Sequence, residues 1–210
     1  MFALEYLENA HRVNKAHSTD EAIVAASEWL AHFHERTMME PNKFETGMIK
    51  YDLSFFYRWI CNTEEFIKQG GKSKTYPWMS KLCLNFKKNV DKLIFSSQSI
   101  IHGEFYPANI LFSHQKVYPV DWQSAAIGSG LIDLASLIEG WPVDITTICK
   151  SAYKNNRSLK AQDNFEELLL LSQIYWQFRW LGERIDWTLD KKIQYRFDRL
   201  IQFSELLNLV

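Results

Sequence analysis

The chain has 210 residues, of which 47% are hydrophobic and 23% are charged. This composition is typical of one folded globular domain and excludes a many-domain protein or an intrinsically disordered chain. Because 24 Lys and Arg residues nearly balance 25 Asp and Glu residues, no overall charge favours binding to nucleic acid or to an anionic membrane.

The cysteines and the hydrophobic runs indicate a cytoplasmic protein. Cys61, Cys83 and Cys149 are widely spaced and form no C-x-x-C pair, so neither a disulfide framework nor a zinc site is expected. No apolar run reaches the roughly 18 residues that span a bilayer, and the acidic residues of segment 1–9 do not fit a signal peptide.

The first half of the sequence predicts three helices. Apolar residues recur at helical spacing over residues 19–36, behind Ser18 and Glu21 at capping-box spacing. A second such segment starts at Leu53 and ends at Gly70 and Gly71, and a third runs from about Pro77 to Ile94.

The pattern changes at Ser99. Segments 100–102, 109–112 and 117–120 are short and β-prone, and a polar turn at 113–116 predicts a small hairpin. Further helices are expected at 131–139, from Pro142 onward, at 164–183 and at 188–208. The sequence therefore predicts a mainly α, α+β chain, one domain over 1–210, with a small central β-hairpin.

The central segment gathers polar residues at loop and strand-end positions, where folded scaffolds commonly hold reactive groups. These residues are His102, Glu104, Asn109, Asp121 and Asp133.

His102-Gly-Glu104-x-x-x-x-Asn109, followed by Val-Asp121-Trp, resembles the catalytic loop of aminoglycoside phosphotransferases and choline-kinase-like enzymes, relatives of the protein kinases. The resemblance implies the helical C-terminal lobe of that fold. It also implies transfer of the γ-phosphoryl group of ATP or GTP, with Mg²⁺, to a hydroxyl of a small molecule such as an aminoglycoside, choline or a sugar.

By resemblance, Glu104 is the base that accepts the proton of the acceptor hydroxyl, and Asn109 and Asp121 are the Mg²⁺ ligands. Asp133 would be a buried acid that braces the catalytic loop through His102 or through backbone N–H groups. Residues 1–9 resemble the strand that joins the two lobes of such enzymes. The nucleotide would then contact Glu5, Tyr6, Leu7, Leu111 and Val120.

Two departures from the family leave a second hypothesis open. Glu104 stands where relatives usually carry Asp, which moves the carboxylate outward by on the order of 1 Å. The N-terminal β lobe, with its phosphate loop and lysine, is largely absent from the sequence. The alternative is a catalytically inactive lobe that acts as a binding or regulatory module, with an apolar face near residues 1–7, Leu111 and Val120 that self-associates or binds a separate N-lobe chain. A misplaced translation start would also explain the missing strands.

Other motifs fail on spacing. Gly71-Lys72-Ser73 is no P-loop, because Phe66 stands where the first glycine belongs, and Gly128-Ser-Gly130 lacks the third glycine of a dinucleotide fingerprint. His32 and His34 would point to different faces of a helix, which does not favour a metal site. The aromatic residues around Trp176 and Trp180 are expected in the core. The charged residues beside them lie in the region that sets acceptor specificity in relatives: Arg179, Glu183, Arg184 and Asp186.

Overall fold

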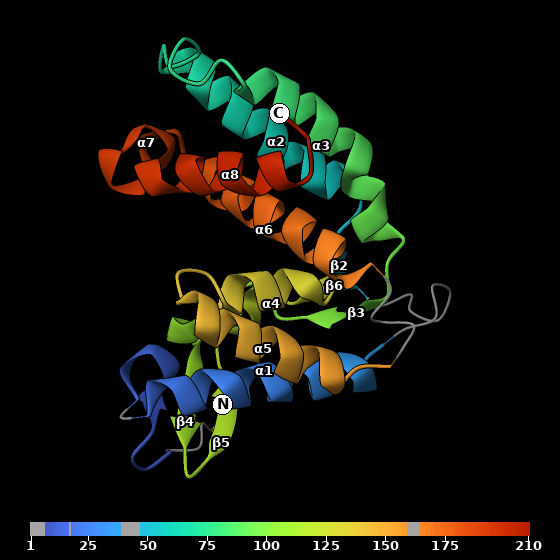
Figure 1. Ribbon diagram of the computed structural model, residues 1–210, viewed down its shortest axis with the longest axis vertical. Coiled ribbons are helices and arrows are strands. Elements are labelled where there is room, and N and C mark those ends of the chain that lie inside the picture. Colours follow the sequence, from blue (N-terminus) through green and yellow to red (C-terminus); the bar gives the residue numbers. More distant parts are fainter. Residues whose placement is uncertain (1–6, 17, 39–46, 159–163) are drawn as a thin grey trace.

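The computed structural model describes residues 7–16, 18–38, 47–158 and 164–210, and it is mainly helical, with two small sheets. Helices α2, α3, α6, α7 and α8 form one half of the molecule, and α1, α4, α5 and the sheets form the other (Figure 1). The mainly α fold class expected from the sequence is confirmed.

The first three predicted helices are confirmed as α1 (Thr19–Arg36), α2 (Leu53–Gln69) and α3 (Met79–Ile94). Asp52 caps α2, since its side chain accepts a hydrogen bond from the backbone N–H of Phe55 at 2.8 Å. Ser18 occupies the N-cap position of α1, but its side chain makes no capping hydrogen bond, so the predicted capping box does not form.

The end of α2 is a left-handed turn. Gly71 has φ +65°, its N–H donates to the carbonyl oxygen of Lys68 at 3.0 Å, and the N–H of Lys72 donates to that of Ile67 at 2.9 Å. These two bonds form a Schellman motif, which satisfies carbonyl groups that the helix would otherwise leave unpaired. The predicted stop at Gly70 and Gly71 therefore has a backbone cause.

The predicted hairpin is confirmed as β4 (Ile110–Ser113) and β5 (Lys116–Pro119). Both residues of its turn, His114 and Gln115, have positive φ, as a two-residue hairpin turn requires. A short strand, β1 (His11–Arg12), adds to β4 on its other side, antiparallel. Of the expected joining strand 1–9, Leu7 precedes a turn at Glu8 and Asn9, and residues 1–6, with Glu5 and Tyr6, lie outside the described residues.

A second sheet was not predicted from the sequence. Its central strand β6 (Ala126–Ser129) pairs antiparallel with β3 (Gln98–Ile101) and parallel with β2 (Ile49–Lys50). All four residues of β6 are buried, so no alternation of polar and apolar residues marks this strand in the sequence. The sheet places the end of β3, where the candidate catalytic loop begins, in the core.

The C-terminal part contains α4 (Leu131–Leu137), α5 (Val143–Asn155) and α6 (Phe165–Leu181), close to the predicted ranges. The single long helix predicted over 188–208 is wrong. The chain forms α7 (Ile185–Leu189) and α8 (Gln194–Leu206), separated at Asp190, which has an extended backbone and accepts a side-chain hydrogen bond from the N–H of Lys192 at 2.9 Å. An Asp that bonds the backbone ahead of it favours a new helix start over helix continuation.

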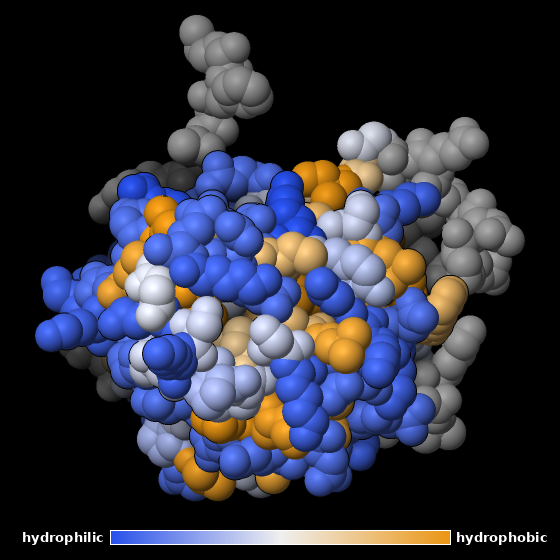
Figure 2. All heavy atoms as spheres, turned by 90° about the horizontal axis from the view of Figure 1, so that it is seen from above, coloured by the Kyte–Doolittle hydropathy of each residue, from blue (hydrophilic) through white to orange (hydrophobic). Residues whose placement is uncertain are grey.

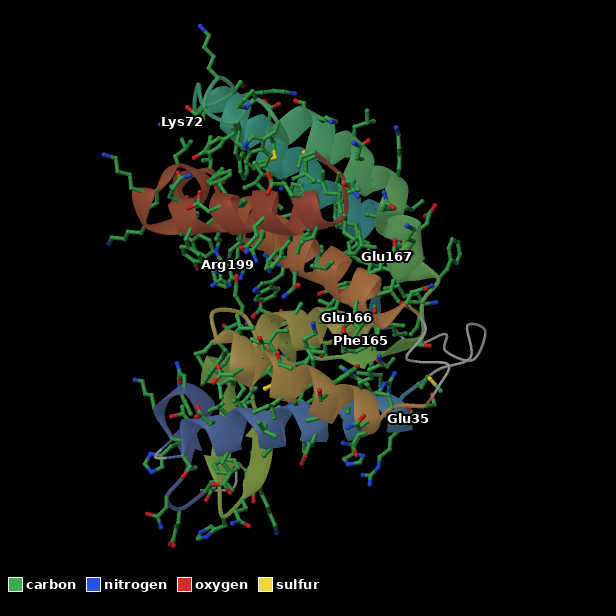
Figure 3. All side chains as sticks on the ribbon, in the orientation of Figure 1. Glu35, Lys72, Phe165, Glu166, Glu167 and Arg199 are labelled. Atoms are coloured by element: carbon green, nitrogen blue, oxygen red, sulfur yellow. The ribbon has the colours of Figure 1, made fainter. Side chains whose placement is uncertain are left out.

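Helix α6 connects the two halves of the molecule. It packs against α4 on one side and against α8, α2 and α3 on the other, and most of its side chains are buried. Two adjacent glutamates of its first turn pair with different helices, Glu166 with Lys150 of α5 and Glu167 with Lys92 of α3, each at 2.6 Å (Figure 3). Seen from the top of Figure 1, the surface is mostly hydrophilic, with apolar residues in small separate groups (Figure 2). Within the described ranges, no helix is both long and apolar enough to cross a bilayer.

Replacement of Gly71 by alanine should lower the free energy of unfolding by about 1 to 2 kcal/mol, because a Cβ disfavours the left-handed backbone. Gly47→Ala is the matched control, since Gly47 has no positive φ and nothing lies within 4 Å of an added Cβ. Urea unfolding measures both variants. Equal effects of the two substitutions would contradict the role assigned to the turn.

Candidate active site

The candidate catalytic loop, residues 102–109, follows β3 and is held first by His102. The backbone N–H of Glu104 donates to Nδ1 of His102 at 3.3 Å, so Nδ1 is the unprotonated ring nitrogen. Nε2 therefore carries the proton and donates it to the carbonyl oxygen of Val120 at 2.9 Å. The buried imidazole thus ties the start of the loop to the residue that precedes Asp121.

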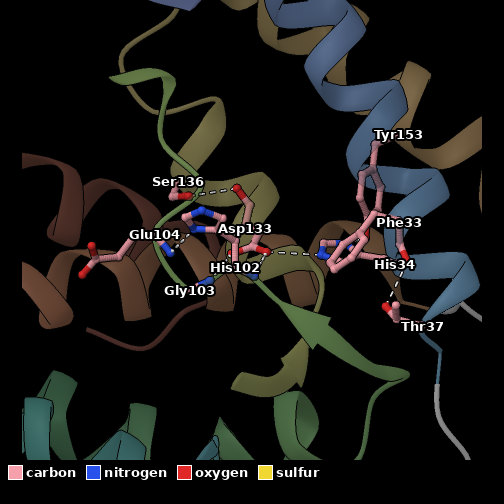
Figure 4. Close-up of polar contacts among 9 residues, drawn as sticks. All are labelled: Phe33, His34, Thr37, His102, Gly103, Glu104, Asp133, Ser136 and Tyr153. Atoms are coloured by element: carbon pink, nitrogen blue, oxygen red, sulfur yellow. Dashed lines mark hydrogen bonds and ion pairs between the residues drawn. The ribbon is translucent and has the colours of Figure 1, made fainter. Parts of the chain in front are cut away.

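The Asp133 carboxylate, on α4, holds the same loop by its backbone. It accepts hydrogen bonds from the N–H groups of His102 at 2.6 Å and Gly103 at 2.8 Å, and it is fully buried (Figure 4). Of the two ways in which the sequence suggested a brace, the structure has the backbone N–H groups; the His102 imidazole bonds Val120 instead.

His34 on α1 is a third donor to Asp133, and the sequence analysis missed it. Its Nε2 lies 3.2 Å from the Asp133 carboxylate, and its Nδ1 lies 2.9 Å from the hydroxyl of Tyr153 on α5. Burial lowers the pKa of His34, more than the neighbouring Asp133 carboxylate raises it. A neutral imidazole then donates from Nε2 to Asp133 and accepts at Nδ1 from Tyr153. A signal was present, because His34 follows Ala26 and Leu30 at four-residue spacing along the apolar face of α1.

Gly103 brings the loop against the segment after Asp121. Its φ is +81°, and an added Cβ would lie 2.3 Å from the carbonyl oxygen of Ser124. Any larger residue would therefore be strained by its backbone angle and would collide with a neighbouring main chain. This close approach places Gly103 and Glu104 beside residues 122–124.

Asn109 and Asp121 stand at adjacent ends of the β4–β5 hairpin. The N–H of Val120 donates to the carbonyl oxygen of Asn109 at 2.9 Å, and the Asn109 side-chain amide donates to the carbonyl oxygen of Glu104 at 3.2 Å. Within the described ranges, the Asn109 Oδ1 has no hydrogen-bond partner. Asp121 is exposed and has φ +67°, a left-handed backbone conformation that Asp adopts more readily than most other residues.

These two side chains fit a magnesium ion. Magnesium prefers oxygen ligands and is commonly held by one or two carboxylates together with substrate phosphates and water. Among the described residues, the Asp121 carboxylate has no hydrogen-bond or ion-pair partner, and no cluster of three or more His, Cys, Asp or Glu forms a closed metal site. A magnesium ion held by these two side chains alone would keep coordination positions for phosphate oxygens and water.

The Glu104 carboxylate points away from Asp133 (Figure 4) and into a cavity of about 430 Å³. It pairs with Arg179 of α6 at 3.4 Å, and Arg179 also pairs with Glu183. Burial raises the pKa of Tyr51, another wall residue, to about 12, so its hydroxyl stays protonated at neutral pH. The lining residues are Ile49, Tyr51, Phe55, Arg58, Trp59, Asn62, Gly103, Glu104, Gln123, Ser124, Arg179 and Glu183.

The structure thus divides the residues singled out in the sequence. Glu104, Arg179 and Glu183 line the cavity, whereas Asn109 and Asp121 do not, and Arg184 and Asp186 pair with each other outside it. Leu111 is half-buried, and Val120 is 38% exposed beside Asp121. Arg58 and Trp59 were missed, because nothing in the amphipathic pattern of α2 marks them as cavity residues.

The free energy of unfolding should fall as the pH drops below about 6.5, the pKa of His in an unfolded chain. His34 then binds a proton in the unfolded chain, whereas in the folded protein its lowered pKa keeps it neutral. His34→Gln should remove this part of the pH dependence and destabilise the fold by about 2 kcal/mol at pH 7. The control is His32→Gln at an exposed position two residues earlier on α1, which should change neither the pH dependence nor the stability at pH 7. Urea unfolding between pH 5.5 and 7.5 measures the effect; identical pH profiles for the two variants would contradict it.

The phosphotransferase enzyme family matches residues 47–168, more than half of the chain, including the loop, the hairpin and α4. No curated protein matches the sequence significantly.

Several solved structures share the fold. Choline kinase LicA from Streptococcus pneumoniae superposes with a TM-score of 0.63 at 15% identity, over 96% of this chain and 68% of that one. An ADP-bound aminoglycoside phosphotransferase gives 0.58 at 12% identity, over 91% of this chain and 65% of that one. A glucosamine kinase gives 0.54 at 12% identity, over 97% and 61%. With the family match over the catalytic loop, they establish that the chain belongs to the phosphotransferase enzyme family and has its kinase-like fold.

Proposed function

We propose that the protein transfers the γ-phosphoryl group of ATP or GTP to a hydroxyl group of a small molecule. The observation that carries this proposal is the placement of Glu104 at the wall of a cavity, with the unpartnered Asp121 and the amide of Asn109 on the adjacent hairpin. Phosphoryl transfer requires mainly such positioning and charge neutralisation.

Asn109 and Asp121 would hold Mg²⁺, which neutralises charge on the nucleotide phosphates when bound. The half-buried Leu111 lies on β4, and the partly exposed Val120 precedes Asp121; both would offer an apolar contact for a base. Two fold relatives support a nucleotide at this kind of site, since one structure is a complex of LicA with AMP and another is ADP-bound.

Glu104 would accept the proton of the acceptor hydroxyl. Its carboxylate has one described side-chain partner, Arg179, which turns it toward the cavity without burying it. Glu is longer than Asp by one methylene, and a loop held against Ser124 at Gly103 would leave room for that extra length. Acceptor and nucleotide would meet at Glu104, from the cavity and from the hairpin respectively.

A second candidate is a binding module without turnover that associates with itself or with a separate N-lobe chain. Val120 and Trp122, 38% and 37% exposed on either side of Asp121, favour a surface that some partner covers. The two functions differ in turnover and share the nucleotide surface.

Isothermal titration with ATP should show binding that Mg²⁺ strengthens, and Asp121→Ala should weaken binding in Mg²⁺ by at least about tenfold by removing a metal ligand. The exposed Asp144→Ala on α5 is the control. Absence of ATP binding by the full chain at millimolar concentration would reject the proposed function.

Glu104→Gln should lower turnover by roughly 10² to 10⁴, since the amide cannot accept the hydroxyl proton, and should leave ATP affinity unchanged. ADP release with a panel of hydroxylated acceptors measures it. Glu28→Gln, an exposed change on α1, should behave as the parent chain. If Glu104→Gln keeps full turnover, a group other than Glu104 accepts the proton of the acceptor hydroxyl.

A further inference from the structure

The cavity beside Glu104 has an unusual charge arrangement for a site that takes a cation. Its walls are the catalytic loop, residues 123 and 124, α2, and the C-terminal end of α6. If Glu104 is the base, the acceptor binds here, so the inference below rests on the proposed function. At about 430 Å³ the cavity is at the small end of the range for ligand pockets.

Two guanidinium groups share one aromatic side chain in this wall. Arg58 lies 4.2 Å from the centre of the Trp59 ring and 5.4 Å from that of Phe55, and Arg179 lies 4.2 Å from the same Trp59 ring. Arg179 is neutralised by Glu104 and Glu183. Arg58, in contrast, has no ion pair or hydrogen bond within the parts of the chain that the structure describes.

This arrangement disfavours a cationic acceptor. The lining residues include two arginines and two glutamates, so the wall has no excess of acid to attract a polyamine. A quaternary ammonium group would need an open aromatic face, and two guanidinium groups already lie against the Trp59 ring. A positive charge close to Arg58 would be repelled by its guanidinium.

We propose that the acceptor is a hydroxylated small molecule that carries an anionic group, a carboxylate or a phosphate monoester, and that Arg58 binds this group. A guanidinium presents two parallel N–H donors to either anion, and its contact with the Trp59 ring restricts its movement before an anion binds. Arg179, which lies against the same Trp59 ring, pairs with Glu104, so Arg58 is the guanidinium left for the anionic group.

The test measures binding without nucleotide, by calorimetry on the full chain, for four probes with related six-carbon skeletons: glucose, glucosamine, gluconate and glucose 6-phosphate. At least one anionic probe should bind about tenfold or more tighter than glucose and glucosamine, and added salt should weaken it. The gluconate and glucose 6-phosphate arms distinguish a carboxylate from a phosphate monoester. Arg58→Gln should abolish the preference, and Arg36→Gln, an exposed arginine at the end of α1, should keep it.

Three results would overturn the inference: glucosamine binding as tightly as the anionic probes, a preference that survives Arg58→Gln, or no binding of either anionic probe up to about 10 mM. Thermal unfolding of Arg58→Gln shows whether this exposed substitution preserves the fold. Failure of the proposed function can be distinguished from failure of this inference. If the chain binds gluconate through Arg58 but releases no ADP, the anion site stands and the phosphotransferase activity is rejected. If the chain phosphorylates only glucosamine, the activity stands and the anion site is rejected.

Discussion

The buried carboxylate of Asp133 is the constraint on which the candidate site depends. An ionised group removed from water costs several kcal/mol unless hydrogen bonds replace its hydration. Three donors do so here, the N–H groups of His102 and Gly103 and the Nε2 of His34, and Tyr153 extends the chain of bonds to α5. One carboxylate thus joins the catalytic loop, α1 and α4, and loss of any donor would leave part of that cost uncompensated.

The loop has an inner and an outer side as a consequence. His102 and Gly103 face the core and are fixed by Asp133, by Val120 and by the close approach to Ser124. Glu104, one residue later, turns outward to the cavity and Arg179. The fixed residues His102 and Gly103 therefore set the position of Glu104, and Gly103 adopts its positive φ without the steric penalty that a Cβ would bring.

What the sequence could predict follows from the range of the interactions. Helices α1 to α3 carry apolar residues at helical spacing, so the periodicity of the sequence located them. The end of α2 depends on residues close to Gly71 in the sequence, so the turn residues located it. The hairpin was marked by its turn, and the loop residues by their spacing. Strand β6 was missed because it is buried on both faces, and the break at Asp190 was missed because the helical period continues across it. His34 and Asp133 are 99 residues apart in the sequence, and Glu104 and Arg179 are 75 residues apart. No local sequence pattern predicts contacts between residues so far apart.

The two halves of the proposed chemistry meet in a single residue. The side chain of Glu104 faces the cavity, whereas its carbonyl oxygen accepts a hydrogen bond from the side-chain N–H of Asn109. A shift of the Glu104 peptide would therefore move both the proposed base and the side chain of Asn109, a proposed metal ligand. Because Asp133 holds the two peptides immediately before it, the same buried carboxylate controls the geometry toward both the acceptor and the nucleotide.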